Sequence, residues 1–98
     1  MRTLRWMAFN LILKEGAVME RDFGKVMYDI IEAAPELKED LEYRSEFWAP
    51  EILWYNLSVY VNEHITPDSS SSKAVKVYSI LCDCSEEEMR NRFMANGH

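Results

Sequence analysis

The feature that most constrains the fold is a run of apolar residues with helical spacing between residues 20 and 34. The run follows the i, i+3, i+4, i+7 pattern of an amphipathic helix, and its members are Phe23, Val26, Met27, Ile30, Ile31 and Ala34. Pro35 comes directly after the run, and a proline disfavours helical backbone at the residue before it. The pattern therefore predicts a helix over residues 20–34 that ends at Pro35.

Two prolines are expected to open the next two helices. Pro35 suits the first turn of a short helix over residues 36–44, because its missing N–H needs no partner there, and Pro50 does the same for a helix over about residues 50–65. The second helix is apolar on two sides: one face carries Leu53, Leu57, Tyr60, Val61 and His64, and a narrower stripe carries Ile52, Tyr55 and Val59. Because such a helix is usually central in a bundle, we expect residues 50–65 to lie at the centre.

The last third of the chain contains a predicted loop and two more predicted helices. Residues 66–72 (TPDSSSS) are polar and rich in helix breakers, which indicates a surface loop. Residues 73–84 are apolar and partly β-branched, so we expect a helix, with a strand as the alternative. Ser85 and Glu88 have the spacing of a capping box, in which the serine accepts from the backbone of Glu88 and the carboxylate of Glu88 reaches back. This motif predicts the start of the last helix.

These segments together predict an all-α fold, a compact bundle of five to six short helices. A chain of 98 residues has room for one hydrophobic core, so we expect residues 1–98 to form a single domain. Residues 3–14 also have apolar residues at helical spacing and are expected to form a helix. The alternatives that stay open are a strand over residues 5–13 or 74–82, and a translation start at Met19, which would make residues 1–18 an N-terminal extension.

The formal charge, 11 − 17 = −6, is unevenly distributed along the chain. Residues 1–14 carry three bases and no acid, whereas residues 15–51 carry eleven acids and four bases, a net charge of −7. This acidity argues against binding to nucleic acid, because phosphates require clustered lysine and arginine. It also argues against docking on an anionic membrane surface. We therefore expect a partner of the acidic block to be basic.

Cysteine usage and hydropathy indicate a cytoplasmic protein. Cys82 and Cys84 are separated by one residue, so they cannot form a disulfide framework, and two close thiols beside six methionines fit a reducing compartment. No segment approaches the ~20 apolar residues of a membrane span. The apolar run from Trp6 to Leu13 is interrupted by Asn10 and has no A-x-A site after it, which argues against a secretion signal.

No catalytic constellation is recognisable in the sequence. The nucleophile motif G-x-S-x-G, a glycine-rich phosphate loop and the zinc motif H-E-x-x-H do not occur. The best metal candidate combines Cys82, Cys84 and His64, but on a helix the two thiols point about 200° apart, and zinc normally takes four ligands. We therefore expect two small buried cysteines, a satisfied His64 at a helix end, and no enzyme activity, metal or cofactor.

Two groups of residues are candidates for binding another protein. Glu36, Glu39 and Asp40 share one face of the helix expected over residues 36–44. An acidic surface of this kind would steer a basic partner, and an ordinary solvated face is the alternative. Tryptophan is a preferred binding anchor, and for Trp48, in the break after this helix, an exposed anchor and a core residue are equal alternatives. The candidate partner-binding residues are Glu36, Glu39, Asp40, Glu46, Trp48 and Trp6.

Between about residues 23 and 95 the layout is similar to that of a known family. The matching segments are the helix that ends at Pro35, the phrase PELKEDLE, the proline-opened aromatic helix APEILWYNLSVYVNEHI and the capped segment SEEEMRNRF. In these segments the chain resembles a family of small helical bacterial proteins of uncharacterised function, whose members are found among candidate toxin-immunity proteins. The resemblance implies a cytoplasmic, non-enzymatic binding protein, and it transfers no site residue.

The expected function is that of a small acidic inhibitor that binds and blocks an enzyme that handles nucleic acid. Such enzymes have large basic surfaces, which an acidic protein can occupy in place of nucleic acid. Two settings fit: a phage-encoded protein that blocks a host defence nuclease, and an immunity protein that neutralises a toxin. The alternative is a small regulatory or assembly subunit that dimerises through Trp6, Phe9 and Leu13, so a monomer and a homodimer both stay open.

Overall fold

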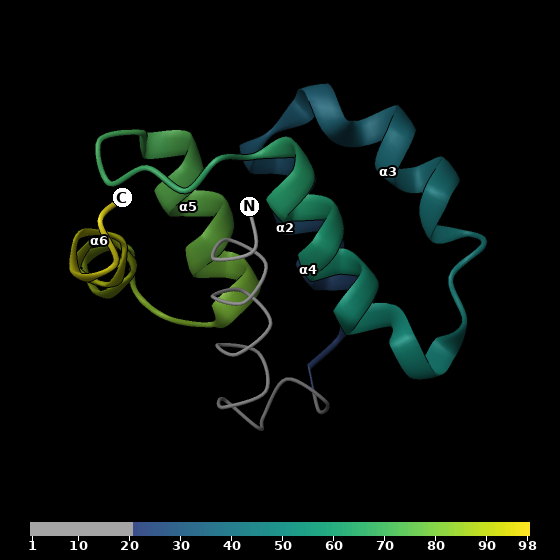
Figure 1. Cartoon of the computed structure of the whole chain (residues 1–98). Coiled ribbons are helices and arrows are strands. Elements are labelled where there is room, and N and C mark those ends of the chain that lie inside the picture. Colours follow the sequence, from purple (N-terminus) through teal and green to yellow (C-terminus); the bar gives the residue numbers. More distant parts are fainter. Residues whose placement is uncertain (1–20) are drawn as a thin grey trace.

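The computed structural model describes residues 21–98, which form five α-helices and two 3-10 helices (Figure 1). The elements in chain order are α2 (Phe23–Ala33), η2 (Pro35–Leu37), α3 (Lys38–Ser45), η3 (Pro50–Ile52), α4 (Leu53–His64), α5 (Ser72–Cys82) and α6 (Glu86–Ala95). The all-α class is confirmed, and the strand alternative over residues 74–82 is wrong. The predictions for residues 1–18, including a strand over 5–13, lie outside the described residues.

The helix boundaries follow from local sequence signals. Asp22 caps α2 by accepting a hydrogen bond from the backbone of Lys25 at 3.2 Å. Each of the two prolines opens a 3-10 turn that leads into an α-helix, as the missing N–H of proline allows. Ser85 caps α6 by accepting from the backbone N–H of Glu88 at 3.0 Å. The other half of the predicted capping box is wrong, because the carboxylate of Glu88 pairs with Arg92 instead.

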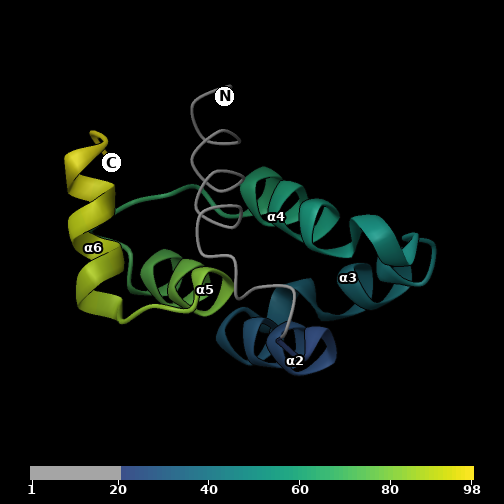
Figure 2. The same cartoon turned by 90° about the horizontal axis from the view of Figure 1, so that it is seen from below.

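The central helix is α5, and the prediction that residues 50–65 lie at the centre is wrong. Most of α5 is buried, and it packs against both α2 and α6 (Figure 2). On α4 only one face is buried. In the predicted second stripe, Tyr55 of α4 is 48% exposed and Ile52, the last residue of η3, is 45% exposed. The buried residues of α5 are Ala74, Val75, Val77, Tyr78, Ser79, Leu81 and Cys82.

Tyr78 joins the central helix to the end of α4. Its hydroxyl lies 2.8 Å from the carbonyl oxygen of Ile65 and 2.7 Å from Oδ1 of Asn62. Burial raises the pKa of Tyr78, so the hydroxyl keeps its hydrogen at all physiological pH values. The hydroxyl has one hydrogen to donate between these two acceptors, and Nδ2 of Asn62 is buried with no partner among residues 21–98.

The carboxyl end of α5 is held by a residue from the start of the described chain. The guanidinium group of Arg21 donates to the carbonyl oxygens of Leu81, at 2.8 Å, and of Ile80. It also lies 5.6 Å from the ring centroid of Trp54, a cation–π distance. Because the last carbonyls of a helix have no partner within the helix, Arg21 satisfies them and fixes α5 against the neighbouring segments.

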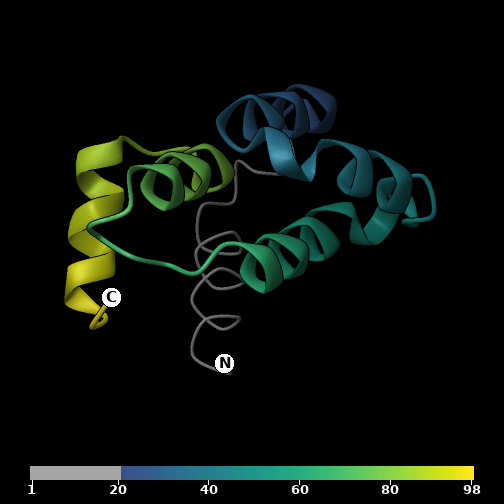
Figure 3. The same ribbon diagram turned by 90° about the horizontal axis from the view of Figure 1, so that it is seen from above.

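The helix α3 lies at the end of the molecule opposite α6, as the views from three sides agree (Figures 1, 2 and 3). It runs beside α4, to which the side chain of Asp40 is hydrogen-bonded. None of the helices within residues 21–98 is long and apolar enough to cross a membrane.

Candidate partner-binding face on α3

The helix α3 buries one face and exposes the opposite one. Leu37, just before α3, and Leu41 within it are buried in the core. Residues three and four positions apart share a helix face. Acidic residues that are not at this spacing from the two leucines therefore lie on the exposed face. We define the α3 face as the exposed residues Glu39, Glu42, Tyr43, Glu46 and Phe47.

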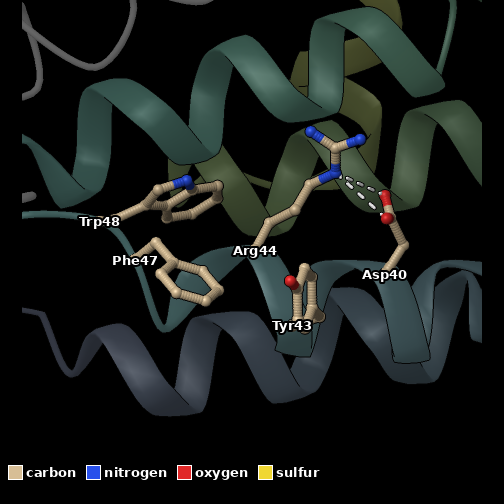
Figure 4. Close-up of a pocket in the computed structure, with 5 residues that line it drawn as sticks. All are labelled: Asp40, Tyr43, Arg44, Phe47 and Trp48. Atoms are coloured by element: carbon tan, nitrogen blue, oxygen red, sulfur yellow. Dashed lines mark hydrogen bonds and ion pairs between the residues drawn. The ribbon is translucent and has the colours of Figure 1, made fainter.

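Two aromatic side chains stand exposed on this face. Tyr43 is 64% exposed and Phe47 is 71% exposed, and their ring centroids lie 5.2 Å apart in an edge-on contact. Beside them is an open hollow of about 390 Å³, which we call the aromatic hollow; Figure 4 shows the side chains that line it. Its lining residues are Asp40, Tyr43, Arg44, Phe47 and Trp48.

Asp40 is a junction between α3 and α4. Its carboxylate accepts a hydrogen bond from the hydroxyl of Tyr60 at 2.9 Å and from Nε of Arg44 at 3.0 and 3.1 Å. The bond from Tyr60, and then the bond from Arg44, hold the pKa of Asp40 below its usual value. Burial, and then donation to this carboxylate, raises the pKa of Tyr60. Asp40 therefore has a structural role, which the sequence does not reveal.

Glu36 is also used within the fold. It forms an ion pair with Lys73, the second residue of α5, and this contact lowers the pKa of the Glu36 carboxyl. By contrast, Glu39 and Glu46 are exposed and make no ion pair with another residue of the described chain. Of the four acids predicted to bind a partner, only these two are thus available. Trp6, the sixth candidate, lies outside the described residues.

Trp48 packs inward, and the exposed ring next to it is Phe47. The indole of Trp48 is half-buried against the core, with ring centroids 6.5 Å from Phe23 and 6.3 Å from Tyr60. Of the two alternatives for Trp48, the structure has the one in which it packs on the core, with one edge of the ring lining the aromatic hollow. The sequence holds one signal for the exposed pair, because Tyr43 and Phe47 are spaced four residues apart.

A second concave surface lies on the other side of α3. This α2–α3 groove has a volume of about 410 Å³. Its apolar part comes from Met27, Tyr28 and Ile31 of α2, and Lys38 and Glu42 of α3 also line it. Tyr28 is 61% exposed. The α3 face is therefore flanked by a depression on each side: the aromatic hollow, which also contains the Asp40–Arg44 ion pair, and the mainly apolar α2–α3 groove.

The histidine and cysteine candidates are separated in the fold. Nδ1 of His64 lies 2.9 Å from the carbonyl oxygen of Tyr60, so this nitrogen carries the hydrogen and donates it. The imidazole stacks on the ring of Tyr60 at 4.0 Å, with Nε2 3.7 Å from the Asp40 carboxylate. The expectation of a satisfied His64 at a helix end is confirmed. Cys82 is buried and Cys84 is half-buried, and no three metal-ligating side chains gather anywhere within residues 21–98.

Comparisons of the chain with protein-family models, with curated proteins and with solved structures found no match.

Proposed function

We propose that this protein is a non-enzymatic binding protein that docks its α3 face on a basic surface of another protein. One observation carries the proposal: Phe47 and Tyr43 expose most of their surface beside Glu39 and Glu46, which have no ion-pair partner among the described residues. Exposed aromatic rings remove less apolar surface from water than buried ones, and aromatic side chains are preferred anchors at interaction sites. The aromatic pair would supply the buried contact, and the carboxylates the attraction.

The charge of the region supports a cationic partner. Residues 36–51 contain six acids and two bases, a net charge of 2 − 6 = −4. Two of the acids are paired within the fold, Glu36 with Lys73 and Asp40 with Arg44. The other four acids and Lys38 make no ion pair within residues 21–98, so a net −3 is left for a partner. Such a surface speeds the association of a basic protein and repels an acidic one.

The partner class that fits best is a cytoplasmic enzyme that handles nucleic acid. These enzymes bind phosphate backbones on surfaces rich in lysine and arginine, and the α3 face offers carboxylates where a backbone would offer phosphates. The mechanism is occlusion: the protein covers the surface that the nucleic acid needs. This mechanism suits two settings, a phage-encoded inhibitor of a host defence nuclease and an immunity protein against a toxin.

The test is affinity capture from a bacterial lysate at low salt, followed by mass spectrometry and by a nuclease assay of the captured enzyme. We expect the wild-type protein to retain a basic enzyme and to inhibit it. Glu39→Lys should slow association about tenfold, because it places a cation on the α3 face. The matched control is Glu87→Lys, an exposed position on α6 at the far end of the molecule. Equal association rates for the two variants would contradict the proposal.

The alternative, a small regulatory or assembly subunit that acts by dimerisation, is favoured by a different surface. Ile52 and Tyr55 form an exposed apolar stripe on the side of α4 that faces away from the core. Light scattering on the full chain and on a chain that begins at Met19 tests this alternative. A dimer that is lost on truncation, or on substitution of Ile52→Ser, would favour it over inhibition. A monomer in every case would count against it.

A further inference from the structure

The helix α3 separates two depressions and carries acids on the crest between them. With about 100° of rotation per residue, Lys38 and Glu42 fall on the side of α2, and Asp40 and Arg44 fall on the side of α4. The lining residues agree, since the first pair lines the α2–α3 groove and the second pair lines the aromatic hollow. Glu39 and Glu46 lie between the two sides.

We infer that the partner crosses α3 with an extended segment in which two apolar side chains flank a short run of cationic ones. One apolar side chain enters the aromatic hollow against Tyr43 and Phe47, and the other enters the α2–α3 groove against Met27 and Tyr28. The cations between them meet the carboxylates on the crest. This inference rests on the proposed function and adds the chemistry and spacing of the segment that is recognised.

The dimensions of a helix set the spacing of the two apolar residues. An α-helix with its side chains is about 10–12 Å across, and an extended chain advances about 3.3 Å per residue. About three residues are therefore needed to cross α3 from one depression to the other. Lysine and arginine suit these positions, because their aliphatic stems cover apolar surface while their charged ends reach carboxylates.

Charge favours a basic polypeptide over a second copy of this chain and over a nucleic acid. In a symmetric dimer formed through the α3 face, Glu39, Glu42 and Glu46 of one copy would face the same carboxylates of the other copy, which is repulsive. A nucleic acid would bring phosphates to the same carboxylates. A basic polypeptide neutralises them and fills both depressions at the same time.

Synthetic peptides test the inference through the backbone amide chemical shifts of the isotope-labelled full chain. The probe has two leucines separated by three lysines. Three comparison peptides are used. The first has the same composition with the two leucines adjacent. The second has serines in place of the leucines, and the third has glutamates in place of the lysines. We expect the probe to bind at least about fivefold more tightly than each comparison peptide, with shift changes in both depressions. Absence of binding, or equal binding of all four peptides, would overturn the inference.

Variants of exposed side chains separate this inference from the proposed function. Phe47→Ala and Tyr28→Ala each remove one apolar contact without touching the core, and Met94→Ala, on α6 and 56% exposed, is the control. We expect the first two, but not the control, to weaken probe binding about fivefold or more. If Phe47→Ala and Glu39→Lys weaken binding and Tyr28→Ala does not, the two-sided segment is wrong and the docking face stands. If none of them weakens binding, both proposals fail.

Discussion

At the scale of single residues, position in the fold divides acids that the sequence presents as equivalent. Glu36, Glu39 and Asp40 share one predicted helix face, yet Glu36 pairs with Lys73 and Asp40 accepts from Tyr60, while Glu39 faces outward with no ion pair inside the described chain. Partners on other helices make this division, and helical spacing alone does not contain them. Charge reversal at Asp40 would thus disturb the fold as well as any binding, so Glu39 is the sharper probe.

The bond between Tyr60 and Asp40 predicts a stability effect at one hydroxyl. Tyr60 is 3% exposed, and its ring stays in place when only the hydroxyl is removed. We expect Tyr60→Phe to lower the free energy of unfolding by about 1 kcal/mol, the usual net contribution of one hydrogen bond. Urea denaturation measures this difference. Tyr43→Phe, which removes an exposed hydroxyl, is the control and should change the free energy of unfolding by much less.

The ion pair of Glu36 predicts a pH dependence of stability. The hydrogen bond from Lys73 holds the pKa of the Glu36 carboxyl in the folded protein below its ordinary value of 4.5. The contribution of the pair to stability is therefore fully present above pH 4.5 and is lost as the pH falls through the lower folded pKa. We expect Glu36→Gln to reduce the loss of stability on acidification in that range. Thermal unfolding at a series of pH values measures the effect. Glu39→Gln serves as the control, and an equal reduction in that variant would argue against the pair with Lys73.

At the scale of elements, the serine run before α5 shows how a cap is selected. Residues 66–72 contain four consecutive serines, and Ser71 is the one whose hydroxyl accepts from the backbone N–H of Ala74, at 3.1 Å. Asp68 fixes the preceding turn by accepting from the backbone and the hydroxyl of Ser70. The loop and the start of the helix are readable from composition, whereas the identity of the capping serine depends on the backbone path.

The assignment of the cap predicts unequal effects of two neighbouring serines. Ser71→Ala removes the side-chain acceptor at the start of α5, and loss of such a cap costs about 1 kcal/mol. Ser72 is exposed and lies within the first turn, so we expect Ser72→Ala to have little effect. Chemical denaturation of the two variants gives the comparison. A larger loss for Ser72→Ala would mean that the helix begins one residue later.

At the scale of the whole molecule, Arg21 connects segments that are distant in sequence. Its guanidinium reaches carbonyls at Ile80 and Leu81, about sixty positions away, and lies against Trp54 of α4. Charged donors to unsatisfied helix carbonyls are worth more than neutral ones. No local pattern in the sequence indicates this contact, because it joins the start of α2 to the end of α5.

The contact of Arg21 with the end of α5 predicts that removing the guanidinium destabilises the whole fold. We expect Arg21→Met, which keeps much of the aliphatic length, to reduce the free energy of unfolding by about 1.5 kcal/mol. Lys25→Met is the matched control, because Lys25 is 71% exposed and its only ion pair within residues 21–98 is with Asp29 on the same helix. Guanidinium denaturation of both variants, read by tryptophan fluorescence, provides the measurement. A similar effect of the two substitutions would show that Arg21 does not hold α5.

The sequence by itself determined where the helices begin and end. Prolines, capping residues and apolar spacing act within one or two helical turns. They therefore predicted the approximate positions of the helices that the structure has between residues 23 and 95, and the acidic character of the helix over residues 36–44. Tertiary structure decided which helix is central and which acids form ion pairs with Lys73 and Arg44. It also decided that Phe47, and not Trp48, is the exposed aromatic residue. These outcomes depend on contacts between residues far apart in the chain, and a local pattern carries no information about them.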